Sequence, residues 1–419
     1  MNYLHFHGIL IFTEDMNSIN VVNFGCRLNA CESDLIKGFV YELGIVDFTV
    51  INTCAVTTEA ERKLRQTIRK LYGKNPDIKI ILTGCASELN PDYYIKMDGV
   101  VGIISNKTKL SKSEYLKYAI QRKISSVPLR PKVRGFLQIQ NGCDQKCTYC
   151  IVRLTRGNNV SFHEDEILQQ AKLLLTKGYK EIILTGVNIT SYGRDLDAHK
   201  KLPFIVRYLL KNLPELTRLG LSSLDPADID DDLLKIIVSE EKLLPHIHES
   251  VQSGDDLILK RMMRRHTRTQ VIELNEKILC ARPDVIFGAD IIVGFPTETE
   301  EMFSNTKTLL REAKLSLLHI FPFSPRPKTA ASLMPRVEKK IIAKRISELK
   351  QLADDILTQK LTEQIGANVI ILAEDHFNAK TNSFLPAKSL DTLVTGREYL
   401  FHCESIEKNV IIGYPVKEI

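Results

Sequence analysis

The chain has 419 residues, of which 44% are hydrophobic and 26% are charged, and its formal net charge is +6. At about 150 residues per domain, this length predicts two to four domains, and the apolar content excludes an intrinsically disordered chain. No apolar run approaches the ~20 residues of a membrane span. Residues 1–15 lack the basic stretch and the cleavage site of a signal peptide. We expect them to be a floppy extension or an upstream-start artefact.

Nine cysteines are too few for a disulfide framework in a chain of this length. The cysteine usage therefore indicates a reducing, cytoplasmic setting, in which clustered cysteines bind metal or take part in catalysis. The small excess of 57 Lys and Arg over 51 Asp and Glu permits a nucleic-acid partner but does not require one.

The N-terminal domain is expected to span residues 17–124, where short apolar runs alternate with helical periodicity. The expected strands lie at 19–26, 47–54, 78–85 and 100–106, and the expected helices at 32–44, 57–74 and 113–121. This alternation predicts an α/β domain with a parallel sheet flanked by helices. Segment 125–135 is rich in Pro and Arg without periodicity and is expected to be a linker.

A second alternation predicts a central domain over residues 129–361. Its expected strands lie at 135–140, 181–187, 218–224, 246–252, 285–294 and 315–323, with helices between them, for example at 163–178 and 297–314. Six βα units predict a partial (βα)6 barrel rather than the full eight. A long amphipathic helix is expected after Pro335, with apolar positions at Ile342, Ile346, Leu349, Leu352, Ile356 and Leu357. Residues 362–419 are expected to form short strands and a small β-barrel.

The strongest chemical motif is Cys143-x-x-x-Cys147-x-x-Cys150, in a loop directly after the first strand of the central domain. Three thiolates at this spacing can hold three irons of a [4Fe–4S] cluster and leave the fourth iron open for another ligand. The alternatives are zinc or three buried free cysteines. Zinc is disfavoured because no fourth cysteine or histidine lies within a dozen residues.

A second set of cysteines follows from their place on the expected strands. Cys26, Cys54 and Cys85 each end an expected parallel strand, and the carboxyl ends of neighbouring strands share one rim of a sheet. These three thiolates are therefore expected to hold a second cluster, although core cysteines at strand ends are the alternative. Cys31 is expected to be packed in a helix and not to ligate, and Cys280 and Cys403 are expected to be structural.

Small or polar residues also follow the strands of the expected barrel. They are Thr185, Gly186, Asn188, Ser222, Ser223, Asp290 and Gly294. On the fourth strand, His246, His248, Ser250 and Gln252 share one face, which suggests a lumen that holds a polar ligand. Turn and capping roles are the alternative for each residue. Glu249 lies on the opposite, helix-facing side, where we expect a basic partner or a strand edge.

Basic residues gather in one segment after the fourth strand, and acidic residues are nearly absent from it. They are Lys260, Arg261, Arg264, Arg265, His266 and Arg268. Such a run makes phosphate contact credible, although a charge run is usually only a solvated face. A second basic group, from Arg62 to Lys70, lies on an expected helix.

Together, these motifs resemble the radical S-adenosylmethionine (SAM) methylthiotransferases over about residues 18–361. Cys143–Cys150, with aromatic Tyr149 before the third cysteine, resembles the radical SAM loop. The stretches NFGCRLNACESD, NTCAVT and LTGVNITSYG look most like the branch that acts on threonylcarbamoyladenosine in tRNA. The tail resembles a shortened TRAM domain, a small RNA-binding β-barrel.

The resemblance implies an enzyme with two [4Fe–4S] clusters that adds a methylthio group to C2 of the modified adenosine next to the anticodon. One cluster cleaves SAM by one-electron reduction, and the cluster at Cys26, Cys54 and Cys85 supplies sulfur. SAM is expected at Tyr149, Thr185, Gly186, Asn188, Ser222, Gln252, Ile292 and Gly294. The implied partners are tRNA and a flavodoxin- or ferredoxin-like electron donor, with no membrane.

Three departures and three alternatives accompany this resemblance. Cys31 replaces an aromatic residue that is frequent in the branch, Arg153-Leu154-Thr155 replaces an apolar-Pro-aromatic run, and Glu249 replaces an apolar residue. The alternative substrates are isopentenyladenosine in tRNA and a ribosomal protein side chain. A non-enzymatic iron–sulfur electron carrier is the third alternative.

Overall fold

The computed structural model describes residues 10–12, 20–43, 45, 48–118, 133–196 and 200–419. Its contacts divide the chain into two compact units. Unit 1 contains residues 1–130, 141–160 and 324–333, and unit 2 contains residues 131–140, 161–323 and 334–419. No helix in the described ranges is long and apolar enough to cross a membrane.

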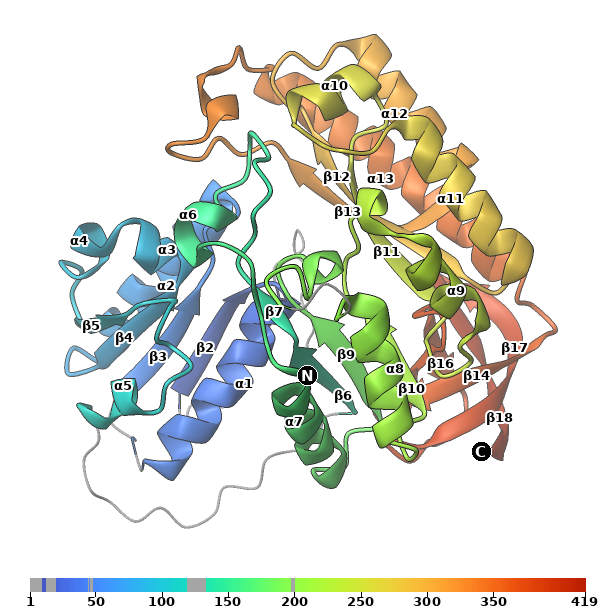
Figure 1. Cartoon of the computed structure of the whole chain (residues 1–419), viewed down its shortest axis with the longest axis horizontal. Helices are drawn as coiled ribbons and strands as arrows, with labels where there is room; N and C mark the ends of the chain where they lie inside the picture. Colours follow the sequence, from blue (N-terminus) through green and yellow to red (C-terminus); the bar gives the residue numbers. More distant parts are fainter. Residues whose placement is uncertain (1–9, 13–19, 44, 46–47, 119–132, 197–199) are drawn as a thin grey trace. The chain divides into compact units, whose positions relative to one another are not determined.

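Unit 1 contains a five-stranded sheet in the order β1-β2-β3-β4-β5 (Figure 1). The strands are β1 (Leu10–Phe12), β2 (Asn20–Gly25), β3 (Phe48–Thr53), β4 (Lys79–Gly84) and β5 (Val100–Ile104). Strands β2 to β5 pair in parallel, as predicted. Strand β1 pairs antiparallel with β2, so the expectation of a floppy extension is wrong for residues 10–12. The rest of that extension lies outside the described residues.

In unit 1, helices follow the parallel strands, and one more helix follows the loop with Cys143, Cys147 and Cys150. They are α1 (Arg27–Glu42), α2 (Thr58–Lys74), α3 (Cys85–Leu89), α4 (Pro91–Tyr94), α5 (Ser113–Leu116) and, after that loop, α6 (Val152–Arg156). Helix α2 shows why the sequence folds this way. The Thr57 side chain accepts a hydrogen bond from the Ala60 N–H and caps the helix. Ala60, Leu64 and Ile68 recur at helical spacing and are buried in the core.

Unit 2 contains six parallel strands in two three-stranded sheets, β10-β9-β6 and β11-β12-β13. The strands are β6 (Arg134–Gln138), β9 (Glu181–Thr185), β10 (Arg218–Leu221), β11 (His246–Gln252), β12 (Ile286–Val293) and β13 (Leu315–Pro322). Single bridges from Leu219 to Leu243 and from Leu224 to Glu249 join the two sheets next to β10 and β11. Together the six strands form the predicted partial barrel. The short strands β7 (Gln140–Asn141) and β8 (Val160–Ser161) lie at unit boundaries.

Helices cover the outside of these strands (Figure 1). They are α7 (Glu164–Thr176), α8 (Leu202–Asn212), α9 (Asp231–Ser239), α10 (Asp256–Arg261), α11 (Arg268–Ala281) and α12 (Glu300–Glu312), with short 3-10 turns η1 (Ile189–Ser191) and η2 (Pro226–Asp228). A third turn, η3 (Ala330–Leu333), belongs to unit 1. Strand and helix side chains share one large apolar core in unit 2, which holds the barrel strands in place.

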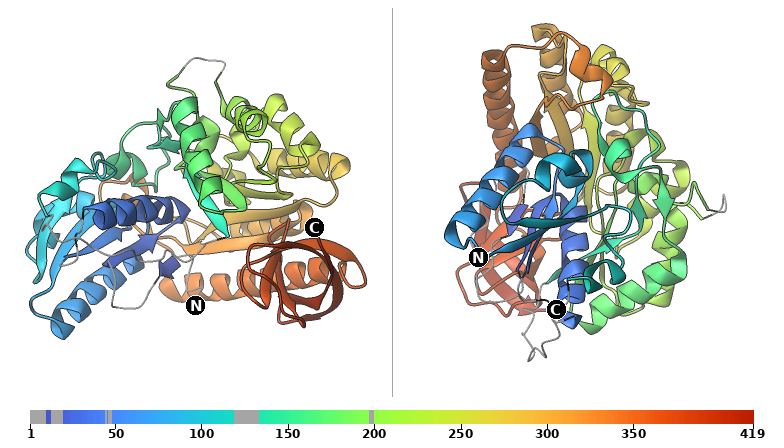
Figure 2. Two further views of the ribbon diagram at one scale, coloured as in Figure 1. Left: turned by 90° about the horizontal axis from the view of Figure 1, so that it is seen from below. Right: turned by 90° about the vertical axis from the view of Figure 1, so that its left-hand side faces the viewer.

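The predicted long helix and the predicted β-barrel are both present at the end of unit 2 (Figure 2). Helix α13 (Lys339–Thr362) packs Leu349 and Leu352 into the core. The closed barrel consists of β14 (Asn368–Ala373), β15 (Asn378–Thr381), β16 (Pro386–Ser389), β17 (Glu398–Glu407) and β18 (Val410–Glu418). The α/β fold class is therefore confirmed. The domain boundaries at 17–124, 129–361 and 362–419 stay a prediction.

Glu249 has no basic partner among the described residues, so that half of the expectation is wrong, whereas β11 does lie at the edge of its three-stranded sheet. Its side chain is fully buried and accepts a hydrogen bond from the Asn275 side-chain nitrogen, 3.1 Å away. Burial raises the pKa of this carboxyl to about 8. Among the described residues, Glu249 Oε1 and Asn275 Oδ1 have no hydrogen-bond donor, and a proton on Glu249 would give Oε1 a hydrogen to donate. The group is therefore mainly protonated at neutral pH.

The raised pKa of Glu249 predicts a loss of stability as pH rises. Its contribution is fully present below pH 4.5 and is lost as pH rises through about 8. In Glu249→Gln, which has no proton to lose, we expect the fall between pH 5 and pH 8 to shrink by about 3 kcal/mol of unfolding free energy. Denaturant unfolding at several pH values measures this. Glu276→Gln, at an exposed position of α11, is the matched control, and an unchanged pH slope in Glu249→Gln contradicts the prediction.

Candidate functional site

Three cysteines of unit 1 lie at the carboxyl ends of neighbouring parallel strands, as predicted. Cys26 follows β2 and precedes α1, Cys54 follows β3, and Cys85 follows β4 and begins α3. Cys54 and Cys85 are buried, and Cys26 is exposed. Burial, followed by the nearby Cys85 and Cys26, raises the pKa of the Cys54 thiol to about 12. The three sulfurs are thus close enough to repel one another as thiolates.

The loop with Cys143, Cys147 and Cys150 also belongs to unit 1. Its entry requires glycine, because Gly142 has a φ of +67° and an added Cβ would lie 1.8 Å from the Asn158 carbonyl oxygen. The Cys143 N–H donates to the Gly157 carbonyl, and the Cys150 N–H donates to the Cys147 carbonyl, both at 3.1 Å. These bonds fold the loop back on itself, and each of the three cysteine residues is partly exposed.

The two cysteine sets influence each other electrostatically within unit 1. Burial is the largest cause that raises the pKa of the Cys150 thiol to about 12, and Cys147, Cys143 and Cys85 add to it. Helices α3 and α6, which adjoin the two sets, also pack together. A thiol with such a pKa stays protonated at neutral pH unless a metal replaces the proton.

The donor sets fit iron–sulfur clusters better than single ions. Within the described ranges, the one group of three donor atoms that lie within 4.8 Å of one another is His248, Asp290 and His319. Neither cysteine set has that close spacing. Three soft thiolates held farther apart suit a multi-iron cluster, whereas a single structural zinc needs four close donors.

The other three cysteines do not share the strand-end positions of one set or the loop of the other. Cys31 is buried within α1, Cys280 is exposed in α11, and Cys403 is buried in the core of the C-terminal barrel. None of the three lies at the carboxyl end of a parallel strand. Their proposed structural role stays a prediction.

A buried polar network next to Cys26 was missed by the sequence analysis. Arg156, the last residue of α6, forms two hydrogen bonds with the Glu32 carboxylate, at 2.6 and 3.1 Å. The Lys109 ammonium lies 2.6 Å from the same carboxylate. Burial alone would raise the pKa of Glu32, but Arg156 and Lys109 lower it to about 2. The network therefore holds an ionised carboxylate with no solvent exposure.

Asparagines connect this network to the cysteines. The Asn29 Oδ1 atom lies 3.2 Å from an Arg156 nitrogen and 3.4 Å from Cys26 Sγ, which donates to it. Asn106 donates to the Thr155 carbonyl at 2.8 Å and lies 3.8 Å from Cys85 Sγ. Arg153-Leu154-Thr155, which departs from the pattern of the family it resembles, thus lies within α6. The end of this helix is linked to Cys26 through Asn29 and to Cys85 through Asn106.

In unit 2, the residues predicted to bind SAM gather at the carboxyl ends of the barrel strands. Thr185 ends β9, Ser222 follows β10, Gln252 ends β11, and Ile292 and Gly294 lie at the end of β12. This placement agrees with the prediction, although their contact with SAM stays a prediction. Tyr149 lies in the cysteine loop of unit 1.

Gln140 organises the loop after β9 and was also missed. Its Oε1 atom accepts hydrogen bonds from the Val187 and Asn188 N–H groups, both at 2.9 Å. An added Cβ at Gly186 would lie 2.7 Å from the same oxygen. The loop between Thr185 and Asn188 is therefore fixed by one buried amide, and glycine is required by the close approach.

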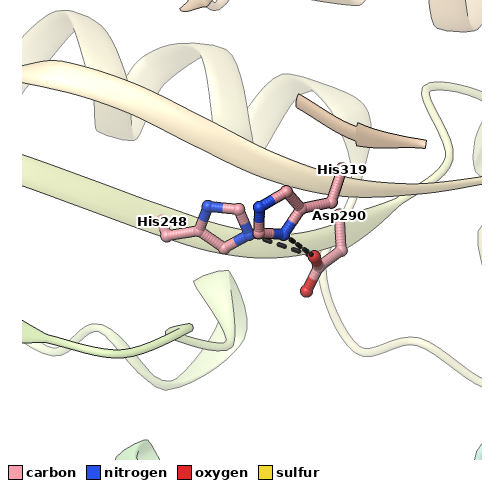
Figure 3. A group of neighbouring side chains, drawn as sticks. All are labelled: His248, Asp290 and His319. Carbon is pink, nitrogen blue, oxygen red and sulfur yellow. Dashed lines mark hydrogen bonds and ion pairs between the residues drawn. The ribbon is translucent and has the colours of Figure 1, made fainter. Parts of the chain in front are cut away.

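A His–Asp–His group brings together side chains from three neighbouring strands, β11, β12 and β13 (Figure 3). On β11, His248 lies on the face opposite to that of the adjacent Glu249, which contacts α11. His248 Nε2 and His319 Nδ1 lie 3.0 and 3.1 Å from the same oxygen of Asp290. Burial alone would raise the pKa of the Asp290 carboxyl, but the two histidines hold it well below its ordinary value. The polar face predicted for β11 therefore belongs to a charged group that can contact a polar ligand.

Most of the basic run after β11 is engaged in ion pairs. The Arg264 side chain is only 7% exposed and pairs with Asp225 at 3.0 Å, and Arg265 pairs with Asp225 and Asp228. Arg261 donates to the Thr297 hydroxyl, and Arg268 pairs with Glu312. Phosphate contact by Arg264 is therefore disfavoured, because its charge is already buried and balanced. Lys260 is exposed and has no ion pair within the described segments.

Comparison with family models covers both parts of the site. Residues 137–310 match the Radical SAM superfamily, and residues 18–105 match the uncharacterized protein family UPF0004. The first range contains Cys143, Cys147 and Cys150, and the second contains Cys26, Cys54 and Cys85.

Individual relatives extend over nearly the whole chain. A threonylcarbamoyladenosine tRNA methylthiotransferase MtaB from Rickettsia prowazekii is 43% identical, over 93% of this chain and 95% of the relative. The protein of the same name from Thermotoga maritima is 34% identical, over 86% of this chain and 87% of the relative. A tRNA-2-methylthio-N(6)-dimethylallyladenosine synthase from Geobacillus kaustophilus is 32% identical, over 86% of this chain and 73% of the relative.

A solved structure shares the fold. The radical SAM methyltransferase TsrM from Kitasatospora setae, with cobalamin and a [4Fe-4S] cluster bound, has a TM-score of 0.51. The two proteins are 12% identical, and the match covers 74% of this chain and 71% of the TsrM chain. At this identity the likeness concerns the fold alone.

The two cysteine sets predict two clusters that can be removed one at a time. Anaerobic reconstitution should give about eight irons per chain, and Cys143→Ala/Cys147→Ala/Cys150→Ala should retain about four, because each set holds one [4Fe–4S] cluster. Iron analysis and electron paramagnetic resonance measure this. Cys31→Ala is the control and should retain about eight. Zinc in place of iron, or half the iron in Cys31→Ala, contradicts the assignment.

Proposed function

This chain belongs to the family of radical SAM tRNA methylthiotransferases, and we propose that it adds a methylthio group to C2 of N6-threonylcarbamoyladenosine next to the tRNA anticodon. The observation that carries the proposal is the presence of both cysteine sets in a chain that matches an MtaB protein over 93% of its length. The enzyme uses SAM and [4Fe–4S] clusters, and its macromolecular substrate is tRNA.

The cysteines have separate tasks in this reaction. Cys143, Cys147 and Cys150 would hold the cluster at which SAM is cleaved, with one iron free for SAM. Cys26, Cys54 and Cys85, at the rim of the β2–β4 sheet, would hold the second cluster, which would supply sulfur. When bound, these cofactors supply one-electron SAM cleavage and the transferred sulfur. The chain contributes fixed ligand positions, because hydrogen bonds within the loop and the sheet set where the sulfurs lie.

The inner face of the barrel is suited to a polar nucleoside. Thr185, Ser222 and Gln252 lie at the ends of neighbouring strands. The Asp290 carboxylate provides charge-assisted hydrogen bonding together with the buried His248 and the exposed His319. A barrel lined in this way holds a ligand at the carboxyl ends of its strands. SAM contact by these residues and a flavodoxin- or ferredoxin-like electron donor remain part of the proposal. The same holds for a cytoplasmic setting.

The alternative substrates receive less support. The isopentenyladenosine reading rests on relatives at 32–33% identity, compared with 43% for the MtaB protein. Modification of a ribosomal protein side chain has no support from these relatives, which act on tRNA by name. A simple electron carrier is disfavoured because the chain shares a whole enzyme fold, including a polar barrel interior.

Nucleoside analysis tests the substrate. In a strain that lacks this protein, we expect 2-methylthio-N6-threonylcarbamoyladenosine to disappear from tRNA and the unmethylthiolated nucleoside to accumulate. Mass spectrometry of digested tRNA measures both, and expression of the intact chain should restore the product while Cys54→Ala should not. Selective loss of methylthiolated isopentenyladenosine would instead show that the protein acts on isopentenyladenosine in tRNA.

Lys260 offers a test of tRNA contact that avoids buried ion pairs. If it meets a phosphate, Lys260→Ala should weaken tRNA binding and reduce the slope of log K against log salt by about 0.7–0.9. Binding measured at several salt concentrations gives the slope. Lys277→Ala, at an exposed position of α11, is the control. Equal salt slopes in the two variants would mean that Lys260 is a solvent-exposed residue that does not contact tRNA phosphate.

A further inference from the structure

Within the part of the chain that the structure describes, the Arg156 side chain joins the end of the radical SAM loop to the surroundings of the second cysteine set through charge. Its guanidinium is 3% exposed and lies between the Glu32 carboxylate and the Asn29 side chain. Asn29 in turn accepts the hydrogen bond from Cys26 Sγ. A cation placed here in a buried setting acts on the cysteines with little screening.

The cation of Arg156 lies beside the second cysteine set. Its guanidinium contacts Asn29 Oδ1, which accepts a hydrogen bond from Cys26 Sγ. The preceding Thr155 carbonyl accepts a hydrogen bond from Asn106, whose side-chain nitrogen lies 3.8 Å from Cys85 Sγ. Burial alone would lower the pKa of the guanidinium, but Glu32, followed by Cys85 and Cys26, holds it well above its ordinary value. The interaction therefore favours negative charge on these sulfurs.

The local charges support a role beyond an internal salt bridge. Glu32 is one carboxylate, and it faces two cationic side chains, Lys109 and Arg156, each with a 2.6 Å contact. The second positive charge needs a further negative partner. Three thiolates on a [4Fe–4S]²⁺ core carry a net charge of about −1, which matches this requirement.

We propose that Arg156 is a positioning residue that supplies the counter-charge of the cluster held by Cys26, Cys54 and Cys85 and thereby raises its reduction potential. Because Arg156 ends the helix that follows Cys150, the same residue fixes the position of α6 relative to α1 within unit 1. The sulfur-donating cluster is therefore easier to reduce than its three thiolates alone would allow. This inference rests on the proposed function, since it needs a cluster at the second set.

A single-cluster background separates this effect from SAM cleavage. In Cys143→Ala/Cys147→Ala/Cys150→Ala, the remaining iron reports only on the second set. Into this background we would introduce Arg156→Gln, Arg156→Lys and Glu32→Gln, with Lys112→Gln as the control. Lys112 forms an exposed ion pair with Glu42, so its loss changes the net charge equally without a buried contact.

Redox titration followed by electron paramagnetic resonance measures the potential of the remaining cluster. Arg156→Gln should lower the reduction equilibrium constant at least tenfold, or about 59 mV for one electron. Glu32→Gln should shift it in the opposite direction, because it removes a negative charge. Arg156→Lys should stay close to the background, and so should Lys112→Gln.

The outcomes distinguish the inference from the proposed function. Absence of iron in the background itself would overturn the second cluster and thus the proposed function. Iron retained with equal potentials in Arg156→Gln and Glu32→Gln would reduce Arg156 to a structural ion pair and overturn the inference. If Arg156→Gln loads no iron, Glu32→Gln tests the inference instead: a raised reduction potential supports it, and an unchanged or lowered potential overturns it.

Discussion

Removing protons from buried thiols is the constraint on which the rest of unit 1 depends. Burial and mutual repulsion raise the pKa of Cys54 and of Cys150 to about 12, so an unassisted thiolate at either position is unfavourable at neutral pH. Iron can replace the proton only if the protein also balances the remaining negative charge. The buried cations and amides near Cys26 and Cys85 follow from this requirement.

Sheet topology explains how distant cysteines can meet this constraint together. Strands β2, β3 and β4 are parallel and hydrogen-bonded in register, so their carboxyl ends share one rim. Cys26, Cys54 and Cys85 occupy that rim although long helices separate β2 from β3 and β3 from β4 in sequence. The radical SAM loop achieves the same result locally, with a short spacing and backbone hydrogen bonds. Two cysteine sets of the same chemistry thus arise from long-range and local structure, respectively.

The sequence predicted these ligand sets because strands and cysteines carry local signals. An apolar run marks each strand, and its end marks the rim, so the place of each cysteine follows from pattern alone. Charge pairing carries no such signal. Arg156 meets Glu32 across 124 residues, and Arg264 meets Asp225 across 39. Both arginines are indistinguishable from solvated residues in the sequence. This is why one was overlooked and the other was predicted to contact phosphate.

Two adjacent residues of β11 show that charge pairing in the barrel is also hard to predict from sequence. His248 faces inward and meets the ionised Asp290, while Glu249 faces outward and meets only the neutral amide of Asn275. Because strand side chains alternate between faces, a shift of one position changes the partner and with it the charge state. The inner face can therefore retain a charged group for a polar ligand, whereas the outer face tolerates a carboxyl only as the neutral acid. Sequence periodicity separates the two faces, but the charge state of each group depends on a partner supplied by another strand or helix.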